Sequence, residues 1–309
     1  MSQIERLSLN SERDGLELPL LCLPPDGEIR AVVQIAHGMC EHKDRYVPFM
    51  EFLAEHGYAT VIHDHRGHGE AARERNELGY FGRDGAQSLV DDVHQVTLWA
   101  KSRFPGKKIY LFGHSMGSLA ARAYLLKYEG ELSGVMLSGS PAYNPAAPGG
   151  KLLAQLLGLR SGGRKRSKLL KAITFGPFYR AYPDEGSKCA WLATDKEVVR
   201  AYDESPLCGF TFACNGFQSL YTLMALAYSG RVKAKNPELP IHFLSGENDP
   251  CRGGDRGFRR AVEVMLRRGY TRVGGRVYEG MRHEILNEPG KAEVYKDVIE
   301  KLNEWEAAE

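Results

Sequence analysis

The sequence predicts an α/β protein with a mostly parallel central sheet, helices on both faces of that sheet and a helical insertion. Short apolar runs with strand character alternate with longer segments of helical period, which is typical of buried parallel strands joined by helices. The alternation stops after residue 140 and resumes near Pro240. With 309 residues, 43% of them hydrophobic, the chain is long enough to bury a large core.

The expected strands are the short apolar runs. In chain order they lie at residues 16–23, 31–36, 58–62, 108–112, 132–137, 241–244 and 273–278. Helices are indicated where apolar residues recur three and four positions apart. These helices lie at 46–53, 89–100, 258–265 and 294–305, and a further one at 116–128 begins with small residues that allow close approach to the sheet.

The domain organisation follows from the interruption of this pattern. Residues 141–236 are helix-like, with Gly and Pro breaks and no strand–helix alternation. We therefore expect a core formed by residues 1–140 and 237–309, with residues 141–236 inserted as a helical cap over one edge of the sheet.

Composition excludes several classes of protein. No apolar run approaches the roughly 18 residues that a membrane-spanning helix needs, and the charged first 20 residues do not form a secretory signal. The six cysteines include no C-x-x-C pair, which favours reduced thiols. The net charge of +2 is too balanced for a nucleic-acid-binding protein. A soluble, cytoplasmic protein without a nucleic-acid partner is expected.

The segment Gly113-His114-Ser115-Met116-Gly117 matches the pattern G-x-S-x-G between an expected strand and an expected helix. Such a turn holds a serine in strained geometry with its hydroxyl above the carboxyl edge of the sheet. Side chains at Gly113 and Gly117 would collide with the tight strand–helix crossing. Ser115 is therefore the expected nucleophile.

A serine needs a base to remove its proton, so a histidine is expected downstream. Only His242 and His283 follow Ser115 in the chain. His242 lies inside an expected strand, where a role in the core or on the face of the sheet is favoured. His283 lies just beyond the last strand, so we expect it to be the base.

The acid that orients this base is expected after the preceding strand, in the segment Ser245-Gly246-Glu247-Asn248-Asp249-Pro250. Asp249 is favoured by its shorter side chain and by its place at the end of the loop. Glu247 and Asp255 stay open as alternatives.

The oxyanion that forms during acyl transfer needs two N–H donors. The loop after the early buried strand, at 37–42, is expected to supply the backbone N–H of Met39. The backbone N–H of Met116, at the start of the helix behind Ser115, is expected to supply the second donor.

These motifs, in this order, resemble the α/β-hydrolase fold, and within it the branch of monoacylglycerol lipases and bacterial lysophospholipases, which is also grouped with the serine aminopeptidases. The matching blocks are HGMCEH at 37–42, DHRGHGE at 64–70, GHSMG at 113–117, GENDP at 246–250 and RHEILNE at 282–288. In this family the last three of these blocks carry the nucleophile, the acid and the base, which fall here on Ser115, Asp249 and His283.

The resemblance and the serine machinery predict a hydrolase of carboxylic esters of lipid type, such as monoacylglycerols or lysophospholipids, that needs no metal or organic cofactor. The partner is then a small ester or lipid molecule. An aminopeptidase on the same triad is the second reading, and it needs acidic groups in the cap to hold an ammonium group. A non-catalytic binding protein that has kept the fold is a third reading.

Two charged features carry alternative interpretations. The segment His63-Asp64-His65-Arg66-Gly67-His68 resembles a metal-binding H-x-H-x-D-H motif, but glycine occupies the position of the aspartate ligand, so a metal site is not expected. Residues 141–183 hold eight basic and no acidic side chains, together with a leucine-rich helix. This part of the cap is either a solvated basic segment or a surface that contacts lipid and attracts phosphate groups.

Overall fold

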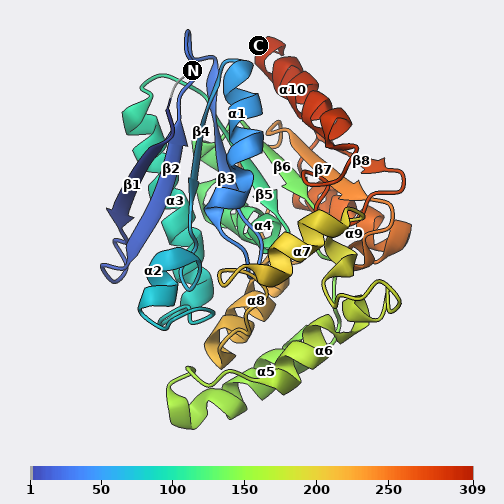
Figure 1. Cartoon of the computed structure of the whole chain (residues 1–309). Helices are drawn as coiled ribbons and strands as arrows, with labels where there is room; N and C mark the ends of the chain where they lie inside the picture. The colour runs from blue at the N-terminus through green and yellow to red at the C-terminus, as the bar shows by residue number, and fades with distance from the viewer. Residues whose placement is uncertain (1–2, 309) are drawn as a thin grey trace.

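The computed structural model describes residues 3–308, which form an eight-stranded sheet with the order β1-β2-β4-β3-β5-β6-β7-β8 (Figure 1). The strands from β4 to β8 in this order run parallel, whereas β2 pairs antiparallel with both β1 and β4. In chain order the strands are β1 (Glu5–Asn10), β2 (Glu17–Leu23), β3 (Ala31–Ala36), β4 (Tyr58–His63), β5 (Ile109–His114), β6 (Gly134–Ser138), β7 (Ile241–Gly246) and β8 (Val273–Tyr278). All seven strands expected from the sequence are present.

Strand β1 has no counterpart among the strands expected from the sequence. It is an edge strand that pairs only with β2, and most of its side chains are exposed. Charged and polar residues are usual on such an edge, because they discourage pairing with other chains. The apolar run that marks a buried strand is therefore missing from this segment.

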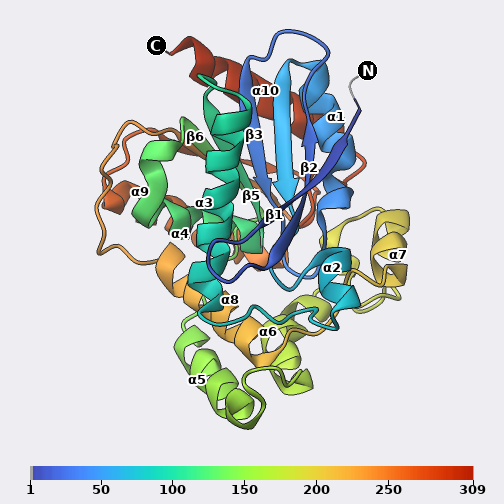
Figure 2. The same ribbon diagram turned by 90° about the vertical axis from the view of Figure 1, so that its left-hand side faces the viewer.

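Helices cover both faces of the sheet, as predicted. Figure 2 shows α1 and α10 on the side opposite to α3 and α4. Neighbouring residues of β3 serve the two faces in turn, with Val33 packed in the core beneath α1 and α10 and Val32 in the core beneath α3 and α4. The helices outside the insertion are α1 (Val47–Glu55), α2 (Gly69–Glu74), α3 (Gly85–Arg103), α4 (Met116–Tyr128), α9 (Gly254–Arg268) and α10 (Lys291–Ala307).

The chain between β6 and β7 is helical, as the sequence indicates. Its helices are α5 (Ala147–Gly158), α6 (Lys168–Tyr179), α7 (Lys196–Glu204) and α8 (Cys214–Ala227). Helix α8 packs against α4 of the core, and α5 packs against α8. Figure 1 shows α5 and α6 as the outermost layer of the molecule, far from both termini. No helix among residues 3–308 has the length and apolar character needed to cross a membrane.

Short 3₁₀ helices complete the described chain. They are η1 (Lys43–Tyr46), η2 (Glu129–Glu131), η3 (Leu159–Ser161), η4 (Ala190–Leu192) and η5 (Pro250–Arg252). The helix η1 continues the loop after β3, and η5 begins directly after Asp249.

The crossing between β5 and α4 leaves no room for side chains. A Cβ atom on Gly113 would lie 2.6 Å from the carbonyl oxygen of Gly117, and one on Gly117 would overlap the carbonyl oxygen of Ala36. These neighbours are backbone atoms, which yield less readily than the end of a flexible side chain. The structure therefore confirms that both positions require glycine.

We predict that Gly117→Ala lowers the free energy of unfolding by about 1–3 kcal/mol or more, because the methyl group must push β3 and α4 apart. Gly130→Ala is the matched control, since a Cβ atom there meets nothing within 4 Å. Urea denaturation followed by circular dichroism measures both variants. Equal midpoints for the two variants would contradict the steric argument.

Candidate active site

Ser115 lies at the turn between β5 and α4, where its backbone is strained as the sequence predicts. Its φ of 51° and ψ of −116° fall in a region that non-glycine residues rarely adopt. The turn is held by a hydrogen bond from the Ser115 N–H to the carbonyl oxygen of Ser138 at 2.9 Å. The hydroxyl of Ser118 also donates to the carbonyl oxygen of Ser115 at 2.6 Å. The serine side chain is thereby fixed at the carboxyl edge of the sheet.

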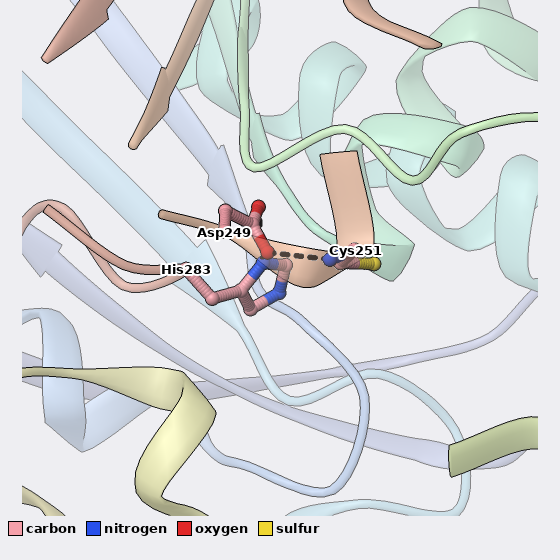
Figure 3. Close-up of side chains that lie close together, drawn as sticks. All are labelled: Asp249, Cys251 and His283. Atoms are coloured by element: carbon pink, nitrogen blue, oxygen red, sulfur yellow. Dashed lines mark hydrogen bonds and ion pairs between the residues drawn. The ribbon is translucent and has the colours of Figure 1, made fainter. Parts of the chain in front are cut away.

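The structure brings together the three residues expected to form the triad. His283 Nε2 lies 2.9 Å from Ser115 Oγ, and His283 Nδ1 lies 2.8 Å from Asp249 Oδ2. Asp249 also accepts a hydrogen bond from the backbone N–H of Cys251 at 2.8 Å through its other oxygen, as Figure 3 shows. Both His283 and Asp249 are buried, so water does not compete for these contacts.

The residues kept open as alternatives lie elsewhere. Glu247 accepts a hydrogen bond from the backbone N–H of Gly280 and is exposed, and Asp255 forms an ion pair with Arg252. His242 lies half-buried in β7, where burial lowers its pKa to about 4. None of the three contacts Ser115 or His283 in the described structure, which leaves Asp249 as the acid within reach of the imidazole.

Burial and charge act in opposite directions on His283. Burial alone disfavours the imidazolium ion, but the Asp249 carboxylate beside it outweighs this effect and raises the pKa of His283. The ring lies between His114 and Trp191, each with its centroid 4.8 Å away. Because burial lowers the pKa of His114 to about 3, this neighbour stays neutral and adds no repulsive charge near neutral pH.

The donor atoms of Asp249, Cys251 and His283 lie within 4.8 Å of one another, which is close enough for a metal ion (Figure 3). However, His283 Nδ1 and Asp249 are already hydrogen-bonded to each other, and burial raises the pKa of the Cys251 thiol well above its ordinary value. A protonated thiol is a poor metal ligand. The donor set therefore fits a hydrogen-bonded relay better than a metal centre.

The histidine-rich turn after β4 is packed inside the protein. Its rings contact one another and His37, with centroids of His37 and His65 4.1 Å apart. Burial lowers the pKa of His65 and of His68, the latter to about 4. His68 Nδ1 contacts the carbonyl oxygen of Arg66 within the turn. Across residues 3–308, these histidines are not part of any group of donors spaced for a metal ion.

In the loop after β3, the backbone N–H groups on either side of Met39 donate hydrogen bonds to side chains, whereas that of Met39 does not. The N–H of Gly38 donates to the Glu41 carboxylate, and the N–H of Cys40 donates to His68 Nε2 at 3.2 Å. Met39 lies between them, and its N–H takes part in none of the described hydrogen bonds. Met116 is the first residue of α4, where a helix leaves its N–H groups without intrahelical partners. Both N–H groups are therefore available for an oxyanion.

A buried network of ion pairs among Arg45, Glu41 and Glu284 supports this loop. No role was assigned to these three residues from the sequence. Arg45 donates to Glu41 at 2.6 Å and forms two hydrogen bonds, at 2.8 and 2.6 Å, with Glu284. Burial alone would raise the pKa of Glu284, but the charge and the hydrogen bonds of Arg45, together with smaller contributions from His114 and Asn287, lower it to about 2. Arg45 thus links the loop that carries Met39 to the residue that follows His283. The signal in the sequence that could have indicated this network is the presence of Glu41 and Glu284 inside the motifs at 37–42 and 282–288.

Two cavities meet at Ser115. The first, of about 50 Å³, is also lined by His283 and Lys171, and we call it the histidine-side cavity. The second, of about 90 Å³, is lined by residues such as Leu119 and Met224 and by no charged side chain among the described residues, and we call it the apolar cavity.

Comparison with known proteins agrees with this geometry. Residues 27–290 match the Hydrolase_4 family, described as serine aminopeptidase, S33. The chain is 30% identical to the monoacylglycerol lipase of Mycolicibacterium smegmatis over 89% of this chain and 88% of that protein. The chain belongs to the serine aminopeptidase S33 family.

Two further comparisons agree with this assignment. The chain is 27% identical to the human monoglyceride lipase, covering 94% of this chain and 87% of that protein. Its fold matches that of a thermostable carboxyl esterase from Bacillus coagulans in complex with glycerol, with a TM-score of 0.89, 24% identity, and coverage of 99% and 100% of the two chains. The α/β-hydrolase fold expected from the sequence is thus confirmed for this S33 family member.

We predict that Asp249→Asn lowers kcat/KM by about four orders of magnitude, because the imidazole loses the group that orients it. The acid limb of the pH profile should also move to lower pH, since Asp249 raises the pKa of His283 and only neutral His283 acts as a base. Glu247→Gln is the control and should change neither quantity. A profile for Asp249→Asn that coincides with that of the wild type would contradict this assignment.

Proposed function

We propose that this protein is a serine esterase that hydrolyses carboxylic esters of lipid type, such as monoacylglycerols or lysophospholipids, through an acyl-enzyme on Ser115. The observation that carries the proposal is the continuous hydrogen-bonded chain from Ser115 through His283 to Asp249 at the carboxyl edge of the sheet. The names of the relatives from M. smegmatis and from humans support the substrate class.

The proposed reaction has two steps, formation of the acyl-enzyme and its hydrolysis, and His283 acts first as a base and then as an acid in each. His283 Nε2 takes the Ser115 proton while Oγ attacks the carbonyl carbon, and the N–H groups of Met39 and Met116 stabilise the resulting oxyanion. His283 then gives the proton to the leaving alcohol, and the acyl group stays on Ser115. In the second step a water molecule gives a proton to His283 Nε2 and attacks the acyl carbonyl carbon. The bond to Ser115 Oγ then breaks, His283 returns the proton to Oγ, and the acid leaves.

The cavities support an ester substrate over a peptide amine. We propose residues 141–236 as the cap over a core of residues 1–140 and 237–309. None of the acidic residues of 141–236 lines either cavity, so the cap offers no carboxylate to hold a substrate ammonium. The cap residue Glu185, for example, is paired with Arg282. An aminopeptidase is therefore the weaker alternative, although the family description names one.

We predict that Ser115→Ala and His283→Ala each abolish hydrolysis of p-nitrophenyl butyrate, because the first removes the nucleophile and the second its base. A fluorophosphonate probe should label the wild type at Ser115 and fail to label Ser115→Ala. Circular dichroism checks that both variants fold. Retained hydrolysis in either folded variant, or no labelling of the wild type, would support a non-catalytic binding protein.

We also propose that the outer helices of the cap contact lipid surfaces. Three leucines, Leu152, Leu156 and Leu159, are 56%, 58% and 72% exposed on the outermost layer of the molecule. Leu169 and Ile173 of α6 are also exposed. The segment that carries these side chains, 141–183, also holds eight basic residues, which favour anionic lipids. We further propose a cytoplasmic location, which the six free thiols support.

Not every basic residue of the cap is free for this contact. Arg164 forms an ion pair with Glu77 at 3.1 Å and lies over the ring of Tyr80, and Arg166 donates to the carbonyl oxygen of Leu78. These two arginines tie the cap to the segment after α2. Replacing them would disturb this junction as well as the surface charge, so the exposed leucines give the cleaner test.

We predict that replacing Leu152, Leu156 and Leu159 together by Gln lowers binding to vesicles of phosphatidylcholine and phosphatidylglycerol more than about tenfold, since each buried CH₂ group contributes about 0.8 kcal/mol. The control is the double variant Leu98→Gln with Leu266→Gln, because these leucines are 42% and 47% exposed but lie on α3 and α9, outside the proposed cap. Vesicle flotation measures binding. Equal binding of both variants would count against this surface.

A further inference from the structure

We propose that Lys171 is a specificity-determining residue that binds a phosphate group carried by the alcohol part of the ester. The preferred substrates are then esters of lysophospholipid type rather than neutral monoacylglycerols. This inference rests on the proposed esterase function and adds to it the chemical class of the leaving alcohol.

The direction of proton transfer decides which cavity receives the alcohol. His283 gives its proton to the oxygen of the leaving alcohol, so the alcohol must lie on the side of Ser115 that His283 lines. That side is the histidine-side cavity, which Lys171 also lines. The apolar cavity reaches Ser115 without His283 and has no charged lining residue among those described. It therefore suits the acyl chain.

Lys171 is held close to the loop that carries Met39. The residue lies half-buried on α6, and its Nζ donates a hydrogen bond to the carbonyl oxygen of Gly209 at 2.8 Å. The N–H of Gly209 in turn donates to the carbonyl oxygen of Cys40 at 3.1 Å. An ammonium group has three N–H donors, so two remain for a ligand.

No carboxylate among the described residues that line the histidine-side cavity forms an ion pair with this ammonium. The carboxylates of Glu41 and Glu284 are both bound by Arg45, and among the described residues Lys171 forms no ion pair with an acidic side chain. Burial raises the pKa of the Cys189 thiol to about 12, so this neighbour is uncharged at neutral pH. Lys171 is therefore the one charged side chain that residues 141–236 contribute to the lining of this cavity.

The walls around Lys171 strengthen its attraction for an anion. Aromatic residues, including Phe175, Phe210 and Phe212, line the same cavity. Apolar walls exclude water and lower the local dielectric constant, which increases the energy of an ion pair. A neutral glycerol group would leave the ammonium without a counter-charge there, whereas a phosphate accepts charge-assisted hydrogen bonds from it. Lys171 therefore favours an anionic head group.

The test compares two soluble substrates, 1-hexanoylglycerol and 1-hexanoylglycerol 3-phosphate, which differ only in the phosphate. We expect Lys171→Gln to lower the ratio of kcat/KM for the phosphate ester to that for the neutral ester by roughly 10- to 100-fold, the factor for losing a hydrogen bond to a charged group. Lys171→Arg should keep more of the ratio than the glutamine variant. An equal loss on both substrates would show a structural role and overturn the proposal.

Lys168→Gln is the matched control, because Lys168 lies on the same helix but is exposed and lines neither cavity. It should keep the wild-type ratio. If it lowers the ratio as much as Lys171→Gln does, general attraction to the basic surface explains the preference and the proposal is wrong.

A binding measurement separates this proposal from the proposed function. In the Ser115→Ala protein, calorimetry should detect glycerol 3-phosphate more tightly bound than either glycerol or inorganic phosphate, and Lys171→Gln should remove that difference. If the wild type hydrolyses neither ester, the proposed function fails, and this binding experiment still decides the role of Lys171. Equal binding of glycerol 3-phosphate with and without Lys171 would overturn the inference.

Discussion

The tight crossing between β5 and α4 is the constraint on which the site depends. Because Gly113 and Gly117 carry no side chains, the two backbones approach closely enough to force Ser115 into its strained turn. The turn raises the serine hydroxyl above the sheet and points the start of α4 toward the same space. The proposed nucleophile Ser115 and one proposed oxyanion donor, the N–H of Met116, are thus placed by a single backbone feature, and a wider crossing would displace both together.

Parallel strands bring the remaining groups to the same place. The loops after β3, β7 and β8 emerge at the carboxyl edge of the sheet, and they carry Met39, Asp249 and His283 respectively. Groups that are distant along the chain therefore meet in space, although no local sequence pattern indicates that they are close. Arg45 then fixes two of these loops relative to each other, since it is bonded to Glu41 and Glu284.

Features that rest on periodicity or motif could be predicted from the sequence, and features that rest on three-dimensional pairing could not. Six of the seven predicted strands are mostly buried, and the seventh, the edge strand β8, is largely exposed but still carries Val273, Val277 and Tyr278. The edge strand β1 is mostly exposed and rich in charged and polar residues, so it leaves no such signal. Ser115 and His283 follow from a short motif and from the small number of histidines after it. The role of Arg45 depends on two carboxylates from separate loops, and that of Lys171 depends on how α6 packs over the core. Neither arrangement has a fixed spacing in sequence.

The segment between α6 and α7, which lies in the proposed cap, also contacts the loops of the proposed active site. Tyr182 donates to the carbonyl oxygen of Asn248 at 2.6 Å, next to Asp249, and the N–H of Glu284 donates to the carbonyl oxygen of Leu192 at 2.7 Å. One cap segment therefore holds the loops of both the acid and the base. Lifting the whole cap would break these bonds and release His283 from the aromatic ring at Trp191. Substrate entry that preserves the triad must leave this segment in place, which confines any opening to the parts of the cap that do not touch the two loops.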